Sequence, residues 1–261
     1  IGYMGNNVYP FRSGEALRAV LLNQWERISL GRIAATIVVE RVFDGLVMLC
    51  FVIIPLLMLD LATPEIQAVV GVGTPIFLTA LVIFLALAAR PDALRKFVGF
   101  FTARMPARFE AIFNALTDEL LAGLVGLQSL SGVARVFVYS LLSWALEATV
   151  YWVVGVAFGL DISYTVMLVV VGAVNLAGLV PASPGQFGVF EFFASTVLMA
   201  AGVPEETALA YALLVHLTIW LPPTVMGFGI LARLGLGFSA VTRAHELERQ
   251  AAESSATTPA P

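Results

Sequence analysis

Long uninterrupted apolar segments constrain the fold of this chain more than any other feature of its sequence. They lie at 33–59, 66–89, 136–158 and 207–231, and each is about as long as the ~20 apolar residues that a transmembrane helix needs. The chain is 59% hydrophobic and only 12% charged, whereas soluble domains are about half apolar and about a quarter charged. A membrane β-barrel would instead alternate with a period of two residues. We therefore predict an all-α, polytopic transmembrane helix bundle.

The distribution of basic residues predicts how the bundle is oriented. Lys and Arg gather at 12–32, 90–108 and 233–249, and none lies between Arg135 and Arg233. Because cytoplasmic loops carry an excess of basic residues, these three segments are expected in the cytoplasm. Acidic turns near residues 60–65, 161 and 205–206 then lie outside. We predict a multi-pass protein of the plasma membrane whose basic loops and C-terminal tail are cytoplasmic.

The domain organisation is expected to be simple. Residues 1–233 form one transmembrane domain, and residues 234–261 form a polar, disordered tail. The chain starts at Ile1 without a signal peptide, so we expect further spans before it. Cys50 is the single cysteine and no Cys/His cluster is present, so we predict no metal, cofactor or internal disulfide. No nucleic-acid partner is expected, and oligomer formation is left open.

Two short apolar runs flank the sequence PASPGQFGVFE at 181–191. The runs at 164–180 and 192–201 are each shorter than a full span, and the charge pattern starts and ends this region outside. A re-entrant hairpin fits these limits, with its turn buried in protein or lining a wet cavity, although full crossings are not excluded by the sequence. We also expect Pro222 and Pro223 to interrupt the last span.

Two stretches share a pattern that predicts an inverted repeat. Asn7, Pro10 and Gly14 are followed by a helical run, as are Asn175, Pro181 and Gly185 on the opposite side. Inverted repeats with broken helices meet at a central binding site. The structural turn residues are expected to be Pro10, Gly14, Pro181, Pro184, Gly185 and Gly188.

Three charged residues lie within the first long span. Glu40 and Asp44 share a helix face, and Arg41 can reach Asp44 three residues later. A charge near the centre of a membrane helix costs on the order of 3 kcal/mol, so the group must be paired or hydrated. It is either a structural ion pair near the cytoplasmic interface or one wall of a polar cavity.

The second half of the chain holds isolated titratable residues. Glu147 lies midway along its span, Glu191 follows the Pro/Gly turn, and His216 lies near the middle of the last span. With no basic residue nearby in sequence, the two carboxyls are protonated, paired with arginines of the first half, or hydrated. His216 is either a hydrogen-bonded packing residue or, with Glu147, part of a proton relay.

At these motifs the sequence resembles a known family. GNNVYPFRSGEALRAVLL at 5–22, ERVFDG at 40–45 and PASPGQFGVFE at 181–191 are similar to the flippase-like membrane domain of the lysylphosphatidylglycerol synthase transmembrane family. The resemblance extends from the first residue to about Arg233 and implies about two further spans before it. It implies movement of an anionic, aminoacylated or glycosylated lipid between leaflets. Synthase members also carry a soluble domain, for which the tail after Arg233 has no room.

Lipid translocation is therefore the leading functional hypothesis. The residues expected to bind the lipid headgroup are Asn6, Asn7, Arg12, Glu15, Arg18, Glu40, Arg41, Asp44, Asn175 and Glu191. Arg12 and Arg18 suit a phosphate, while the carboxylates suit a cation or a proton. Alternatively, the basic residues at 12–32 only anchor the chain at anionic lipid.

Two other function classes remain open. One is a membrane-embedded transferase that acts on a lipid-linked donor, although no catalytic motif is present and we predict no enzyme activity. The other is an accessory partner of a lipid-modifying enzyme or glycosyltransferase. Because no nucleotide-binding motif is present, transport would be downhill or coupled to an ion gradient.

Overall fold

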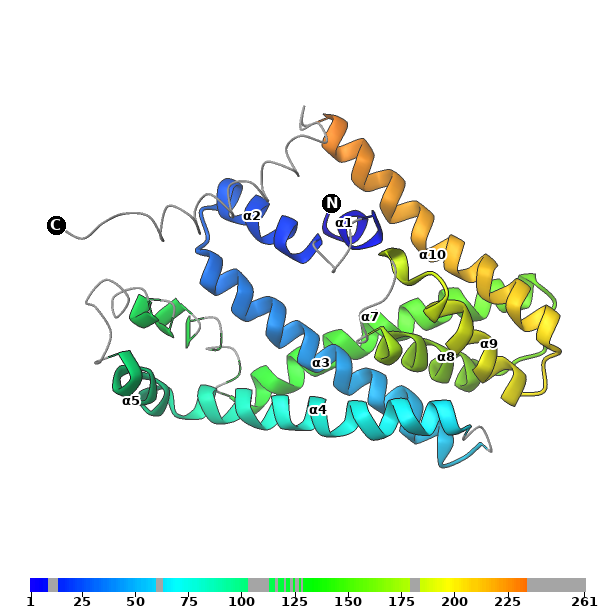
Figure 1. Ribbon diagram of the computed structural model, residues 1–261, viewed down its shortest axis with the longest axis horizontal. Helices are drawn as coiled ribbons and strands as arrows, with labels where there is room; N and C mark the ends of the chain where they lie inside the picture. The colour runs from blue at the N-terminus through cyan, green and yellow to red at the C-terminus, as the bar shows by residue number, and fades with distance from the viewer. Residues whose placement is uncertain are drawn as a thin grey trace.

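The computed structural model is a bundle of α-helices (Figure 1). It describes residues 1–8, 14–59, 63–102, 113–115, 117–119, 121–122, 124, 127, 129–178 and 184–233. These residues contain no strand, which confirms the predicted all-α class. The elements in chain order are α1 Gly2–Val8, α2 Gly14–Glu26, α3 Leu30–Leu56, α4 Pro64–Ala89, α5 Pro91–Thr102, α7 Leu130–Ala157, α8 Tyr164–Ala177, the short 3₁₀ turn η3 Pro184–Gln186, α9 Val189–Ala200 and α10 Glu205–Arg233.

Side-chain caps fix where several of these helices begin. Thr63, Ser129 and Ser163 each stand before a helix, and their hydroxyl oxygens accept a backbone N–H of the first turn of α4, α7 and α8. Pro64 at the first position of α4 needs no such partner because it has no N–H. The helix starts are therefore encoded locally, close to where the apolar segments begin.

The four predicted spans correspond to α3, α4, α7 and α10. Among the described residues, three helical segments are long and apolar enough to cross a membrane, namely Pro64–Ile83, Leu130–Ala157 and Glu205–Arg233. The remaining predicted span, α3, has 27 residues but carries Glu40, Arg41 and Asp44 within its apolar stretch. The protein is a multi-pass membrane protein, and its first long helix carries three charged residues within five positions.

Two local expectations differ from the structure. The basic loop at 90–108 contains a helix, α5, and the last span is not interrupted, since α10 continues through Pro222 and Pro223. Prolines are tolerated in membrane helices where neighbouring side chains satisfy the backbone. Pro222 and Pro223 leave the carbonyls of Thr218 and Ile219 without their helical N–H donors, and the next carbonyl, that of Trp220, accepts from the side chains of Asn7 and Thr224.

The core lies where α3, α8, α9 and α10 pack together. Val47 and Val52 of α3, Val170 of α8 and Val215 of α10 are fully buried in one apolar cluster. Gly172 lets α8 approach the backbone of α3, because any side chain there would collide with Val52 and the carbonyl of Met48. In Figure 1, α8 and α9 lie between α3 and the long α10. The turn η3 joins this core to α1 and is itself only partly buried.

The first two helices are tied to the last one. A side chain at Gly14 would collide with the backbone of α1, so α2 begins in close contact with α1. Met4 of α1 is buried against Gly227 of α10. Gly14, predicted as a turn residue, is thus the first residue of α2 and a helix-contact position. The segment at the start of the chain belongs to the packed bundle.

Candidate functional site

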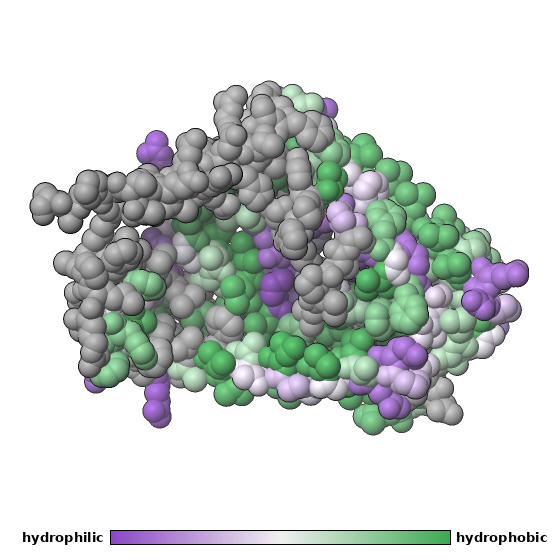
Figure 2. Space-filling model, viewed as in Figure 1, coloured by the Kyte–Doolittle hydropathy of each residue, from purple (hydrophilic) through white to green (hydrophobic). Residues whose placement is uncertain are grey.

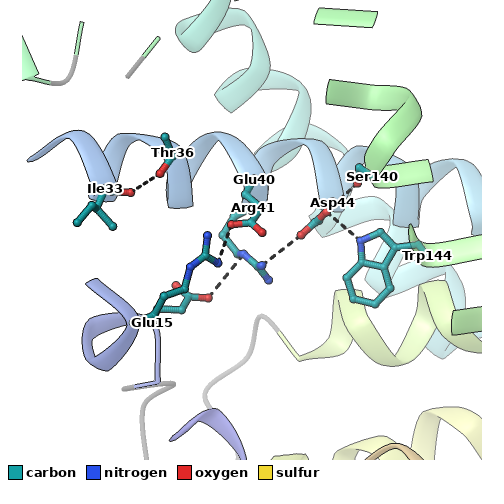
Figure 3. A network of polar contacts seen from close by, with 9 residues as sticks. Glu15, Ile33, Thr36, Glu40, Arg41, Asp44, Ser140 and Trp144 are labelled. Carbon is teal, nitrogen blue, oxygen red and sulfur yellow. Dashed lines mark hydrogen bonds and ion pairs between the residues drawn. The ribbon is translucent and has the colours of Figure 1, made fainter. Parts of the chain in front are cut away.

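A network of charged side chains joins α2 to the middle of α3 (Figure 3). Arg18 of α2 donates to Glu40 of α3 at 3.0 Å. Arg41 lies between Glu15 of α2, at 3.6 Å, and Asp44 of its own helix, at 3.3 Å. The predicted pairing of Arg41 with Asp44 is made, and the two arginines hold three carboxylates. We call these five residues the ion network.

Helix α7 completes the ion network through Asp44. The hydroxyl of Ser140 and the indole N–H of Trp144 both donate to Oδ1 of Asp44, at 2.7 and 2.9 Å. Asp44 therefore binds two neutral donors with one oxygen and Arg41 with the other. Charge-assisted bonds of this kind are about twice as strong as neutral ones. Asp44 is the fixed point of the network.

The ion network is accessible rather than sealed. The side chains of Arg18 and Glu40 are each 41% exposed, and Arg41 is 37% exposed. Figure 2 shows a group of hydrophilic side chains in a recess among hydrophobic ones, in the part of the view where the middle of α3 runs. Polar groups from three helices thus meet at a surface that a bound molecule can reach.

A second polar cluster lies at the turn between α8 and α9. Nδ1 of His216 lies 2.6 Å from Oε1 of Glu191, and Nε2 lies 2.9 Å from the carbonyl oxygen of Gly185. Glu191 also accepts the N–H of Gly188 at 2.6 Å, which caps α9. Both side chains are buried, with 8% of Glu191 and 5% of His216 exposed. We call Glu191 and His216, with their partners Gly185 and Gly188, the proton cluster.

The sequence did not show what neutralises the carboxyl group of Glu191. In the structure its side-chain partner is His216. Both ring nitrogens of His216 are engaged by Glu191 and Gly185, so His216 makes no direct hydrogen bond to Glu147. Phe187 and Phe190 pack against the imidazole, with ring centroids 4.7 and 4.1 Å away. The imidazole is fixed between two aromatic rings and two acceptors.

Asn7 links α1 to the helix that carries His216. Its side-chain amide donates to the carbonyl of Trp220 at 3.2 Å and to the hydroxyl of Thr224 at 2.8 Å. A side chain at Gly185 would meet both the indole nitrogen of Trp220 and the carbonyl of Asn7. The first Asn motif and the later Pro/Gly turn therefore lie side by side, as an inverted repeat requires. The repeat itself stays a prediction.

The other predicted residues occupy separate places. Glu147 lies on α7 one turn beyond Trp144, and Asn175 donates to the carbonyl of Val171 within its own helix. Oδ1 of Asn6 is buried and has no hydrogen-bond partner among the described residues. The predicted residues that lie outside the described part of the chain are Pro10, Arg12 and Pro181, together with the tail at 234–261.

Sequence reasoning missed four polar residues that contribute to these clusters. They are Ser140, Trp144, Trp220 and Thr224. A signal for the first two exists, since Ser140, Trp144 and Glu147 are spaced four and three residues apart and so share one face of α7. Trp220 contributes through its backbone carbonyl, which no sequence pattern reveals.

The comparisons with known proteins now identify the family. Residues 1–227 match the family described as the lysylphosphatidylglycerol synthase TM region. The chain belongs to this family. The resemblance stated from the sequence motifs is therefore confirmed. No solved structure matches the chain significantly.

Curated relatives within the family differ in length and in name. A UPF0104 membrane protein of Methanothermobacter thermautotrophicus is 26% identical over 242 residues, which cover 87% of this chain and 70% of that protein. Glycosyltransferase AglD of Haloferax volcanii is 30% identical over 287 residues, covering 94% of this chain but only 44% of AglD. A phosphatidylglycerol lysyltransferase of Staphylococcus haemolyticus is 32% identical over 97 residues, 37% of this chain and 11% of the transferase. The family thus points to a lipid-related role in a membrane.

Proposed function

We propose that this protein moves a lipid between the two leaflets of the plasma membrane, with the ion network as its headgroup site. The observation that carries the proposal is that Arg18, Glu40 and Arg41 are paired yet more than a third exposed within a helix bundle. A translocating protein must shelter a charged headgroup while the acyl chains stay in lipid. Paired and accessible charges suit this task, because a headgroup can exchange with their partners.

The depth of the network supports this role. Asp44 lies 12 residues before the end of α3 at Leu56 (56 − 44 = 12). At 1.5 Å per residue this is roughly 18 Å, less than the ~30 Å of a hydrocarbon core. If Leu56 lies at the outer edge of that core, Asp44 lies inside it. Charges at such depth are rare and mark substrate pathways.

The outer faces of the helices complete the proposed path. Exposed apolar side chains cover α4, α7 and α10, including Ile76, Leu142, Leu146, Leu217 and Leu221. These faces suit acyl chains, whereas the network suits a phosphate at its arginines and a cationic or hydroxylated group at its carboxylates. The candidate lipids are anionic, aminoacylated, glycosylated or polyprenyl-linked.

Leaflet exchange in liposomes tests the proposal. Purified protein would be reconstituted with labelled phospholipid, glycolipid or polyprenyl phosphate, and exchange would be compared for wild type and Arg18→Ala. We expect Arg18→Ala to slow exchange of at least one lipid, because it leaves Glu40 without its partner. Arg95→Ala is the matched control. Arg95 lies on α5, outside the ion network, and also donates to a carboxylate, that of Asp118 at 2.9 Å. Equal slowing by both variants, or no exchange by folded wild type, contradicts the proposal.

A second candidate function is an accessory role in glycosyl or aminoacyl transfer to lipid. The similarity to AglD and to the lysyltransferase favours it, although this chain spans less than half of either protein. Substitutions in the network would then reduce assembly with the partner enzyme and leave lipid distribution unchanged. Affinity purification of wild type and Arg18→Ala, alongside the exchange assay, separates the two candidates.

A further inference from the structure

The hydrogen bonds of His216 fix the number of protons in the proton cluster. The carbonyl of Gly185 can only accept, so Nε2 of His216 carries a proton and donates to it. A proton must also lie between Nδ1 and the carboxyl of Glu191, because 2.6 Å is a hydrogen-bond distance and an ionised carboxylate also only accepts. Glu191 and His216 together therefore hold two protons, one more than a neutral imidazole beside a carboxylate.

The surroundings explain why the cluster holds this extra proton. With two protons the pair has no net charge, either as imidazolium and carboxylate or as imidazole and carboxylic acid. Losing one proton leaves a net negative charge on side chains that are only 5% and 8% exposed. Burial of an uncompensated charge is costly. The form with both protons, which we call the loaded form, is thus the one that fits this buried arrangement.

Losing the proton also breaks one of the two bonds of His216. A neutral imidazole has one N–H and cannot donate to Glu191 and Gly185 at once. The bond to the ionised carboxylate is the stronger, so it is retained. Nε2 then turns a lone pair toward the carbonyl of Gly185. The turn η3 loses its hydrogen bond to α10.

Few other groups act on this cluster. Other titratable side chains lie on the described helices that pack against α9 and α10, and on α10 itself. They are Tyr3 on α1, Glu65 on α4, Arg135, Tyr139, Glu147 and Tyr151 on α7, Tyr164 on α8, and Glu205, Glu206, Tyr211 and Arg233 on α10. Tyr151 comes close through its ring, which packs against Phe190 beside Glu191. His216 is the titratable side chain that bonds Glu191 directly.

The turn is connected to the ion network by direct packing. Gly185 has a positive φ of 66° and lies against the carbonyl of Asn7 on α1. Helix α1 in turn contacts α2 at Gly14, and α2 carries Glu15 and Arg18. A change at Gly185 therefore reaches the network through two helix contacts.

We propose that Glu191 and His216 form a binding site for one transferable proton, whose occupancy locks the η3 turn onto α10 and whose release unlocks it for lipid movement. The coupling to lipid movement rests on the translocation proposed above, whereas the proton site does not. In this proposal the proton is the ion whose gradient drives transport, which the sequence did not identify.

Spectroscopy on the intact protein tests the proton site by itself. Histidine ring nitrogens would be labelled with ¹⁵N, and His245→Asn would remove the second histidine of the chain, so that His216 gives the signal. Infrared difference spectra against Glu191→Gln would report the carboxyl group. We expect two protons on the pair in the folded protein and the loss of one in a single step as the pH rises. A neutral His216 with one N–H beside an ionised Glu191 throughout overturns the site.

Glu191→Gln tests the coupling. Its amide can donate to Nδ1 and accept from Gly188, so it imitates the loaded form and keeps both bonds of His216. We expect wild-type leaflet exchange to rise with pH and the variant to stay slow at every pH, by roughly tenfold, the effect of one strong hydrogen bond. Glu205→Gln, which changes an exposed carboxyl at the start of α10, the helix of His216, should behave as wild type.

The outcomes separate the two proposals. A variant with the pH profile of wild type overturns the coupling, and the labelled histidine then still decides the proton site. If folded wild type moves no lipid at any pH, the translocation proposal and the coupling fail together. A spectroscopic titration of one proton in that same protein would still support the site.

Discussion

The ion network and the proton cluster both place acidic and basic side chains inside an apolar bundle, but they do so in opposite ways. Arg18 and Glu40 pair at 3.0 Å with 41% of each side chain exposed, whereas Glu191 and His216 pair at 2.6 Å with 8% and 5% exposed. The network has several alternative partners, and the cluster has one bond for each donor and acceptor. An exposed pair can be exchanged for a ligand, whereas a sealed pair changes its bonds when a proton leaves. The same residue types thus serve two tasks according to burial.

Removing His216 should have the largest effect on stability. His216→Ala removes the partner of Oε1 of the buried Glu191, which keeps only its bond from the N–H of Gly188, and removes the partner of the carbonyl of Gly185. We expect the free energy of unfolding to fall by about 3 kcal/mol, as when one partner of a buried pair is removed. Thermal unfolding in detergent measures this. A variant as stable as wild type would show that the cluster is not sealed.

Asp44→Asn should have the next largest effect. The substitution keeps the shape and one acceptor for Ser140 or Trp144 but removes the charge that faces Arg41. We expect a loss of about 1.5 to 3 kcal/mol, the range for a hydrogen bond to a charged group. Asp92→Asn serves as the control, since Asp92 pairs with Arg95 but is 85% exposed and should be neutral. Equal losses in both variants would remove Asp44 as the fixed point of the network.

Arg18→Ala should separate stability from transport. Exposed ion pairs contribute less than about 1 kcal/mol, so thermal unfolding should hardly change. Lipid exchange should nevertheless fall, because the arginine would contact the headgroup. The comparison with His216→Ala is the sharpest test, since stability and transport would respond in a different order. A large loss of stability in Arg18→Ala would mean that the network is structural.

Salt should produce the smallest difference between the two regions. At physiological ionic strength the screening length is about 8 Å, and it shrinks to about 3 Å at 1 M. Headgroup exchange with Arg18 should weaken as salt is added, while the buried Glu191–His216 pair should keep its proton. The ¹⁵N spectrum of His216 and the exchange rate, recorded over one salt series, provide the check. Parallel changes in both would contradict the difference in burial.

Much of the fold can be predicted from the sequence because short-range sequence patterns determine where the helices form. The apolar runs predict α3, α4, α7 and α10, and the three-residue spacing predicts the contact of Arg41 with Asp44. Helix α5 was missed because its basic residues dominate the segment and hide an apolar face. Contacts between distant segments leave no such local pattern. His216 meets Glu191 across two helices, and Trp144 meets Asp44 across a hundred residues, so only packing brings them together.

The bond between Asn7 and α10 has a consequence for how the molecule is made. The partners of Asn7 lie 213 and 217 residues further along the chain. Helix α1, with two asparagines in seven residues, must therefore wait until α10 has been synthesised for the helix that satisfies Asn7. Contacts of such long sequence separation form late and slow assembly. The turn at Gly185, which rests against Asn7, cannot reach its final place before α10 is inserted, so the proton cluster and the α1 contact are completed only after that insertion.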